Sequence, residues 1–232
     1  MINVKTYIYL HLCAINNWKS IIEGFLVTIK DSGLYDFIDE IRVCVYGSDV
    51  EIEEAKILFH SYMKSKLNII FQSNDISLRE KKTLELLKED SQKEDFRVLY
   101  LHSKGNSRKH SLQIEDWVNY MIYFNVTKWK ECINLLDTYD TCGVNLQVDS
   151  RSHTKGWHYA GNFWWSKSEH IKGLGKIENL HPRGIRLDCE QWVCSGEFSG
   201  ASIWTSPSNI DHYTHRYSED EYKNMGIRFN EA

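Results

Sequence analysis

Polar residues that could bind an anion directly follow a short apolar run in the segment Phe96–Gly105. Val98–Leu101 is rich in strand formers, and such a run is typical of a buried strand in a sheet covered on both faces. Ligands of open α/β sheets bind beyond the carboxyl ends of the strands, so His102, Ser103 and Lys104 would face a cleft. An imidazole, a hydroxyl and a cation together suit a phosphate group, although an ordinary polar turn would contain the same residues.

Tryptophan is concentrated in two segments of the second half of the chain. Eight of the 232 residues are tryptophan, and several of them lie within residues 117–129 and 157–165. Core packing is the default role of such side chains. Aromatic clusters beside polar residues also suit stacking on sugar rings.

Strands and helices alternate along the first half of the chain. Asn16 or Asn17 is the predicted cap of a helix, because the apolar residues that follow recur at helical spacing. The predicted elements are a strand at 5–15, this helix up to Ser32-Gly33, a strand at 40–46, a helix at 50–64, a strand at 67–71, a helix at 78–88 and a strand at 97–101. This alternation predicts an α/β fold, with a mostly parallel central sheet and helices on both faces.

The second half is less regular in pattern. A basic loop at 106–111, with Arg108, Lys109 and His110, precedes a predicted long helix at 113–136. The further expected elements are strands at 141–148, 159–166 and 201–205 and helices at 167–174 and 187–194, followed by a polar tail from Ser206.

Composition excludes several classes of protein. A net charge of -4 and a pI of about 6.2 argue against a surface that coats nucleic acid, and no apolar run is long enough to span a bilayer. The six scattered cysteines indicate reduced thiols and a cytoplasmic location. The chain has no GxGxxG, Walker, GxSxG or HExxH motif.

Five short segments carry a further pattern: Leu99–Gly105, Trp117-x-x-Tyr120-Met121, Cys142–Asn145, Gly161–Ser166 and Glu190-x-Trp192. Together they resemble a family of small GT-A-like glycosyltransferases found in large DNA viruses, including transferases of viral capsid glycans, and in bacterial surface-polysaccharide clusters. The resemblance covers roughly residues 6–203. It implies one GT-A-like (Rossmann-like) domain over 1–232, with a nucleotide-sugar-binding half at 1–105, an acceptor and catalytic half at 106–205 and a tail at 206–232.

The resemblance implies that a sugar moves from a UDP- or GDP-linked donor to a glycan or glycoprotein acceptor, in the cytoplasm (the host cytoplasm if the protein is viral). Most GT-A enzymes hold Mn²⁺ or Mg²⁺ on the diphosphate with a DxD motif. Here that position reads His102-Ser103-Lys104, so Lys104 could itself neutralise the leaving group. Alternatively, Asp149, His212 and His215 are candidate metal ligands, unless the two histidines belong to a solvated polar tail.

Inverting transfer needs a carboxylate that takes the proton of the acceptor hydroxyl. Asp188 and Glu190 are the candidates, and an i, i+2 pair on a helix cannot both face one cleft. Glu190 is preferred, because the family pattern has an acid two residues before a tryptophan, here Trp192. Both acids could instead serve only to cap the helix.

The remaining predicted site residues fall into two groups. The donor side is expected to hold Ala14, Asn16, Glu80, Thr83, His102, Ser103, Lys104 and Gly105. The acceptor side is expected to hold Trp117, Tyr120, Asn162, Trp164 and Trp165. Alternation along a strand sends the last two to opposite faces, so one could pack in the core while the other stacks on a sugar.

Two other functions compete with a transferase. A non-catalytic sugar- or nucleotide-binding module would keep the fold without the metal motif. A hydrolase or phosphatase would need a nucleophile or a tight carboxylate cluster, and the sequence displays neither.

Overall fold

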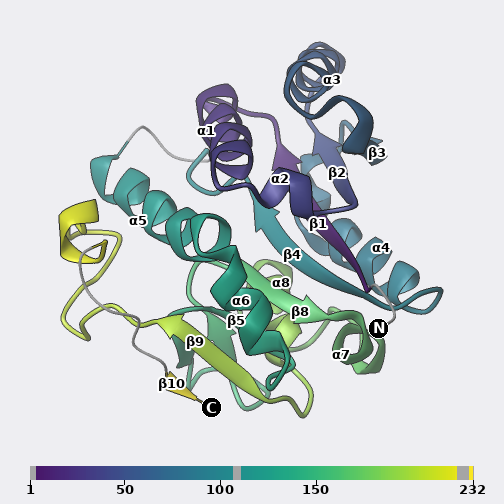
Figure 1. Ribbon diagram of the computed structural model, residues 1–232. Coiled ribbons are helices and arrows are strands. Elements are labelled where there is room, and N and C mark those ends of the chain that lie inside the picture. Colours follow the sequence, from purple (N-terminus) through teal and green to yellow (C-terminus); the bar gives the residue numbers. More distant parts are fainter. Residues whose placement is uncertain (1–3, 107–110, 224–229, 232) are drawn as a thin grey trace.

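The computed structural model describes residues 4–106, 111–223 and 230–231, and among them eight strands form one sheet (Figure 1). In spatial order these strands are β10 (Asn230–Glu231), β9 (Gly200–Trp204), β5 (Thr141–Val144), β8 (Trp164–Lys167), β4 (Phe96–His102), β1 (Lys5–Cys13), β2 (Glu40–Tyr46) and β3 (Leu67–Ser73). β8 and β10 run antiparallel to their neighbours and the other pairings are parallel. The predicted α/β class with a mostly parallel sheet is confirmed.

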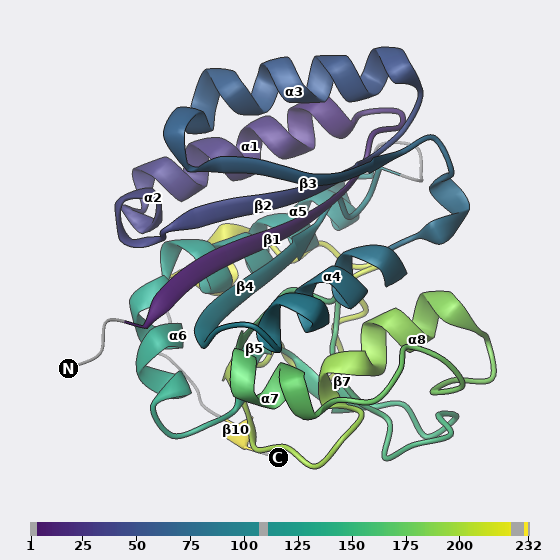
Figure 2. The ribbon, with the colours of Figure 1, turned by 90° about the vertical axis from the view of Figure 1, so that its right-hand side faces the viewer.

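Helices cover both faces of this sheet (Figures 1 and 2). One face carries α1 (Trp18–Asp31), α2 (Leu34–Phe37), α3 (Asp49–Met63), α5 (Leu112–Ile122) and α6 (Trp129–Leu136). The other face carries α4 (Lys81–Ser91), α7 (Ser168–Gly173) and α8 (Ile185–Gln191). No helix in the described ranges combines the length and the apolar character needed to cross a membrane.

The central strands are buried on both faces because successive side chains point in opposite directions. In β1, Ile8 and Leu10 pack under the helices of one face, whereas Tyr7 and Tyr9 pack under those of the other. The six cysteines are free thiols, and all except the half-buried Cys13 are buried.

The first half of the chain agrees closely with the sequence prediction. The predicted helix at 78–88 begins later, at Lys81, because residues 76–78 form a separate 3₁₀ turn. Asn17 lies at the start of α1 but makes no capping hydrogen bond with its side chain. Ser48 caps α3, accepting from the backbone N–H of Glu51.

Three predicted elements of the second half are broken. A π-helical turn at Tyr123–Thr127 separates α5 from α6, which were expected as one helix. The predicted strand at 141–148 breaks at Asn145 (φ 51°), and the one at 159–166 breaks at Gly161 and Asn162 (φ 94° and 61°). The left-handed backbone at these positions ends the pairing of the strands in the main sheet. The segments β6 (Leu146–Val148) and β7 (Trp157–Tyr159) form a separate two-stranded sheet.

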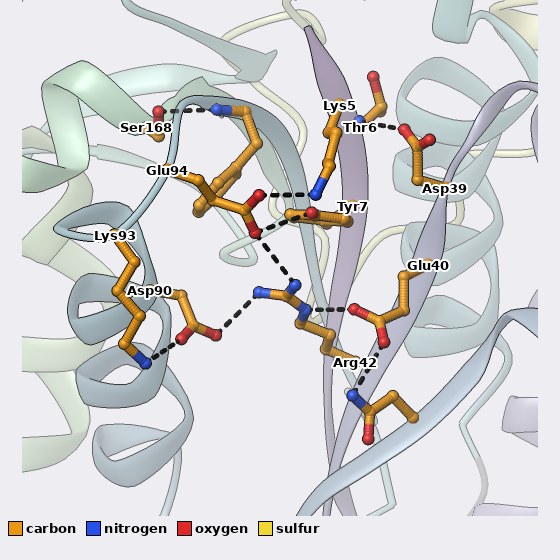
Figure 3. A network of polar contacts seen from close by, with 12 residues as sticks. Lys5, Thr6, Tyr7, Asp39, Glu40, Arg42, Asp90, Lys93, Glu94 and Ser168 are labelled. Carbon is orange, nitrogen blue, oxygen red and sulfur yellow. Dashed lines mark hydrogen bonds and ion pairs between the residues drawn. The ribbon is translucent and has the colours of Figure 1, made fainter.

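A network of charges joins β1, β2 and α4 near the amino ends of the strands (Figure 3). The guanidinium of Arg42 lies 2.8 Å from Oδ2 of Asp90, 2.5 Å from Oε2 of Glu40 and 3.4 Å from Oε1 of Glu94. Lys5 Nζ donates to Oε2 of Glu94 over 2.8 Å. These contacts pair the charge of the partly buried Arg42. The network lies near the amino ends of the strands, away from their carboxyl ends.

Candidate functional site

A cavity of about 430 Å³ lies at the carboxyl ends of β1 and β4. The strand order reverses between these two strands, because β2 and β3 extend the sheet on one side of β1 and β4 begins the other side. Ligands of open α/β sheets bind at such a switch point. The cavity lining contains His11, Glu80, His102, Ser103, Lys104, Gly105 and Glu190, among others.

His102 and Ser103 line the cavity but are also bound to neighbouring strands and loops. His102 Nε2 lies 2.9 Å from the carbonyl oxygen of Gly161 and therefore carries the proton that it donates. Burial lowers the pKa of His102 to about 4, so the ring is neutral at pH 7. Ser103 Oγ accepts from the backbone N–H of Cys13 (2.9 Å) and from the side-chain amide of Asn106 (3.0 Å).

Lys104 and Gly105 form the rim next to α5. Lys104 Nζ lies 3.9 Å from the ring centre of Trp117, a cation–π contact that positions the charge at the cavity. Gly105 has φ +92°, and a Cβ there would lie 2.8 Å from a methyl carbon of Ile114. Only glycine fits this turn without strain.

Glu80 stands just before α4 and faces His102. Its Oε2 accepts hydrogen bonds from the hydroxyl of Tyr100 (2.8 Å) and the side-chain amide of Asn162 (2.6 Å). Its Oε1 lies 3.9 Å from Nδ1 of His102. Asn162, predicted as an acceptor residue, is buried and positions Glu80 instead of lining the cavity.

The two acids of α8 have different surroundings. Glu190 lines the cavity, and its Oε1 lies 3.4 Å from Nε of Arg186. Asp188 is buried and accepts hydrogen bonds from the backbone N–H groups of Leu180 (3.0 Å) and His181 (2.8 Å). Asp188 therefore fixes the preceding loop, and of the two candidate acids only Glu190 lines the cavity, as expected for residues two apart on a helix.

Three further donor-side candidates lie behind the cavity wall. Ala14 is fully buried, and Asn16 donates through Nδ2 to the carbonyl oxygen of Asn106 over 2.6 Å. Thr83 Oγ1 lies 3.0 Å from Nδ1 of His11 and supports that ring from beneath. None of the three candidates is among the residues that line the cavity.

The aromatic candidates for the acceptor side belong to the core. Trp164 and Trp165 point to opposite faces as expected, but both are fully buried, because β8 is central and helices cover both faces. Tyr120 is also fully buried, with its hydroxyl 3.1 Å from Oδ1 of Asn145. Trp117 is buried beneath Lys104. The expectation that Trp164 or Trp165 is exposed to a sugar was wrong.

The candidate metal ligands are engaged elsewhere. Asp149 accepts from Nε and Nη2 of Arg151 at 2.9 and 2.8 Å, and these hydrogen bonds hold the pKa of its carboxyl well below the usual range. His212 is buried and stacks on the rings of Trp117 and Tyr120.

His215 is exposed, with Nδ1 next to the hydroxyl of Thr214. Within the described ranges, no three His, Cys, Asp or Glu side chains are grouped as metal ligands. At the DxD position, His102 and Ser103 bind protein atoms and Lys104 is a cation. This donor set does not fit a divalent cation.

Other residues at the cavity were not foreseen from the sequence. His11 pairs in register with His102, and burial lowers its pKa to about 4. Arg79 and Arg186 add two cations to that of Lys104. Arg79 has φ +49°, a backbone conformation that is rare outside glycine and is often found at binding sites. The basic loop residues Arg108, Lys109 and His110 lie outside the described residues.

Comparison with known proteins places the chain in a family. No protein with a curated description matches the sequence. A family pattern described as a domain of unknown function (DUF8361) matches residues 16–210, a range that includes Glu80, His102–Gly105 and Glu190. The chain therefore belongs to the DUF8361 family.

Proposed function

We propose that the protein is a glycosyltransferase that moves a sugar from a nucleotide-diphosphate sugar to a hydroxyl group of a glycan or protein, with inversion at the sugar. The observation that carries this proposal is the placement of Lys104, Arg79 and Arg186 in one switch-point cavity with Glu190. A GT-A-like fold is part of the proposal, and the strand order with its reversal between β1 and β4 supports it.

The cations match the charge of a diphosphate. Lys104, Arg79 and Arg186 line the cavity, whereas Glu80 and Glu190 are the carboxylates found there. His11 and His102 are neutral at pH 7, since burial lowers the pKa of each to about 4. Charge-assisted hydrogen bonds from fixed cations favour a phosphate anion, and a cavity of about 430 Å³ lies within the size range of small-ligand sites.

The reaction follows from these groups. Glu190 takes the proton of the acceptor hydroxyl as its oxygen forms a bond to the anomeric carbon of the donor sugar. The bond between that carbon and the phosphate oxygen breaks, and the electron pair leaves with the nucleoside diphosphate. Lys104 and the two arginines stabilise the charge that develops on the leaving group, a role that fixed cations perform in other phosphate sites.

A non-catalytic nucleotide- or sugar-binding module is the second candidate function. It is favoured by the engagement of His102 with Gly161 and of Ser103 with Cys13, which leaves Lys104 as the chief polar group of the usual metal-binding segment. Such a module would bind a nucleotide or a sugar and transfer nothing.

The test is a thermal-unfolding panel with UDP, GDP, TDP and CMP and their sugars, each with Mn²⁺, Mg²⁺ or EDTA. A ligand that binds the native state raises the midpoint by mass action. We expect nucleoside diphosphates of one base to raise the midpoint of unfolding. The corresponding nucleotide sugar should be consumed when acceptors are added. Binding without any turnover would favour the module, and no shift with any nucleotide would refute both nucleotide-based functions.

A further inference from the structure

A second cavity adjoins the first one on the far side of Glu190. It measures about 580 Å³ and lies between the β6–β7 sheet, the loop that follows β6, and α8. Arg186, Glu190 and Tyr213 line both cavities. A ligand in the second cavity would therefore meet a donor in the first one at the proposed base.

The charges that line this second cavity are mostly positive. Among the described residues that line it, three arginines and two carboxylates give a formal sum of +1, in a chain whose net charge is -4. The charge of Asp149 is paired with that of Arg151, which donates hydrogen bonds to both carboxylate oxygens at 2.9 and 2.8 Å. Glu190 Oε1 lies farther from its arginine partner, 3.4 Å from Nε of Arg186.

The backbone of Arg183 is anchored to the surrounding loops. Its backbone N–H donates to Nδ1 of the buried His181 over 3.0 Å. The other nitrogen of that ring, Nε2, lies 3.3 Å from Oδ2 of Asp149 and donates to it. This chain of contacts anchors the backbone of Arg183 to the loop after β6, while its exposed side chain lines the cavity with Arg186.

We propose that the second cavity is the acceptor site and that the acceptor carries an anionic group, a phosphate or a carboxylate, bound by Arg183. This inference rests on the proposed transferase function and adds the chemical class of the acceptor. Planar guanidinium groups bind carboxylates and phosphates with two parallel hydrogen bonds, which fixes orientation as well as charge. The anion would hold the acceptor with a neighbouring hydroxyl at Glu190.

The reaction of the acceptor hydroxyl needs no further reactant. The hydroxyl proton passes to Glu190, the hydroxyl oxygen bonds to the anomeric carbon, and the nucleoside diphosphate leaves with the electron pair of the broken bond. The anionic group itself keeps all of its bonds and serves only for binding. Its charge is matched by Arg183, which lines the second cavity and not the first.

The experiment is calorimetric titration of the full chain with glucose 6-phosphate, glucuronate and glucose, with and without UDP or GDP. The two anionic sugars distinguish phosphate from carboxylate, and glucose measures the neutral ring. Arg183→Gln removes the charge from the second cavity only. Lys172→Gln removes an equal charge from the exposed end of α7, outside both cavities.

We expect one anionic sugar to bind at least ten-fold more tightly than glucose, and Arg183→Gln to abolish that difference while Lys172→Gln preserves it. Nucleotide binding should be equal in all three proteins. Equal binding of glucose and both anions, or equal losses in the two variants, would overturn the anion site. Anion binding through Arg183 without any nucleotide binding would refute the transferase function and, with it, the acceptor role.

Discussion

Glu190 and Asp188 lie two residues apart on α8 and illustrate how surroundings assign a role to a carboxylate. Glu190 lines both cavities and has one contact with Arg186. Asp188 accepts two backbone hydrogen bonds and is inaccessible. The first acid is available to a substrate, whereas the second stabilises the loop before the helix.

Glu190→Gln should lower turnover by about 10²- to 10⁴-fold, because the amide cannot accept the hydroxyl proton. Donor affinity should change little, because the charge of the leaving group is matched by other residues. Steady-state kinetics and nucleotide titration measure the two quantities separately. Asp188→Asn is the matched control and should lower the midpoint of unfolding more than Glu190→Gln does. Full activity of Glu190→Gln would mean that another group is the base.

Lys104→Ala should weaken nucleotide-diphosphate binding by about 10- to 100-fold, the cost of one charge-assisted contact of about 1.5–3 kcal/mol. Lys104→Arg keeps the charge and should retain most of the affinity. Titration with the nucleotide found in the unfolding panel measures both. Lys172→Ala serves as the surface control, and an unchanged affinity in Lys104→Ala would exclude Lys104 from the diphosphate site.

At the scale of elements, the bend between β7 and β8 connects the core to the site. Gly161 receives the hydrogen bond of His102, and Asn162 binds Glu80. Both residues have positive φ, and a Cβ on Gly161 would lie 2.2 Å from Sδ of the buried Met121. The bend, which leads into β8 beside β4, thus fixes the positions of the His102 and Glu80 side chains in the cavity.

Gly161→Ala should lower the free energy of unfolding by about 1–3 kcal/mol, because alanine is strained at φ +94° and its methyl group displaces Met121. Gly173→Ala at the end of α7 is the control. A Cβ there meets no atom within 4 Å, so that variant should be neutral or slightly stabilised. Urea unfolding of both variants measures the difference, and equal stabilities would show that the bend tolerates a side chain.

The elements of the first half could be predicted from the sequence because each is a continuous apolar run or a helical stripe. β2 was predicted with its observed bounds, Glu40–Tyr46. Breaks at Asn145 and Asn162 were missed, although asparagine is one of the few residues besides glycine that often adopt a left-handed backbone. The alternation of side chains along a strand correctly placed Trp164 and Trp165 on opposite faces of the sheet. It could not show that helices cover both faces of β8.

The fold brings part of the predicted site residues together. Glu80, the segment His102–Gly105 and Glu190 lie around one cavity, as their proposed roles require. His11, Arg79 and Arg186 were missed because they lie far from one another in the sequence and only the fold brings them to one cavity. One usable signal was present, since Arg79 directly precedes the predicted Glu80 and Arg186 precedes Glu190 by one helical turn.

At the scale of the whole molecule, buried histidines link stability to pH. Burial lowers the pKa of His11, His102 and His212 to about 4, whereas histidine in the unfolded chain titrates near 6.5. Between these values the unfolded chain binds protons that the folded chain does not. The free energy of unfolding should therefore fall as the pH drops from 6.5 to 4, and the histidine contribution is complete above pH 6.5.

His212→Gln should flatten this dependence. Its effect on the difference in unfolding free energy between pH 7 and pH 4.5 should be on the order of 1–2 kcal/mol. Gly173→Ala, which removes no titratable group, should leave the difference unchanged. Urea titrations at several pH values test both variants, and identical profiles for His212→Gln and the unmodified protein would show that this ring does not titrate as its burial implies.

The antiparallel strand β8 has a consequence for the order in which the chain is made. It lies between β4 and β5, yet it begins at Trp164, long after β4 ends at His102. A ribosome adds about 5–20 residues per second, so one edge of a nascent β3–β2–β1–β4 sheet would wait several seconds for its partner. An unpaired apolar edge of this kind attracts other strands. Until the tryptophan pair of β8 has been synthesised, the edge of β4 therefore has no partner strand on that side of the sheet.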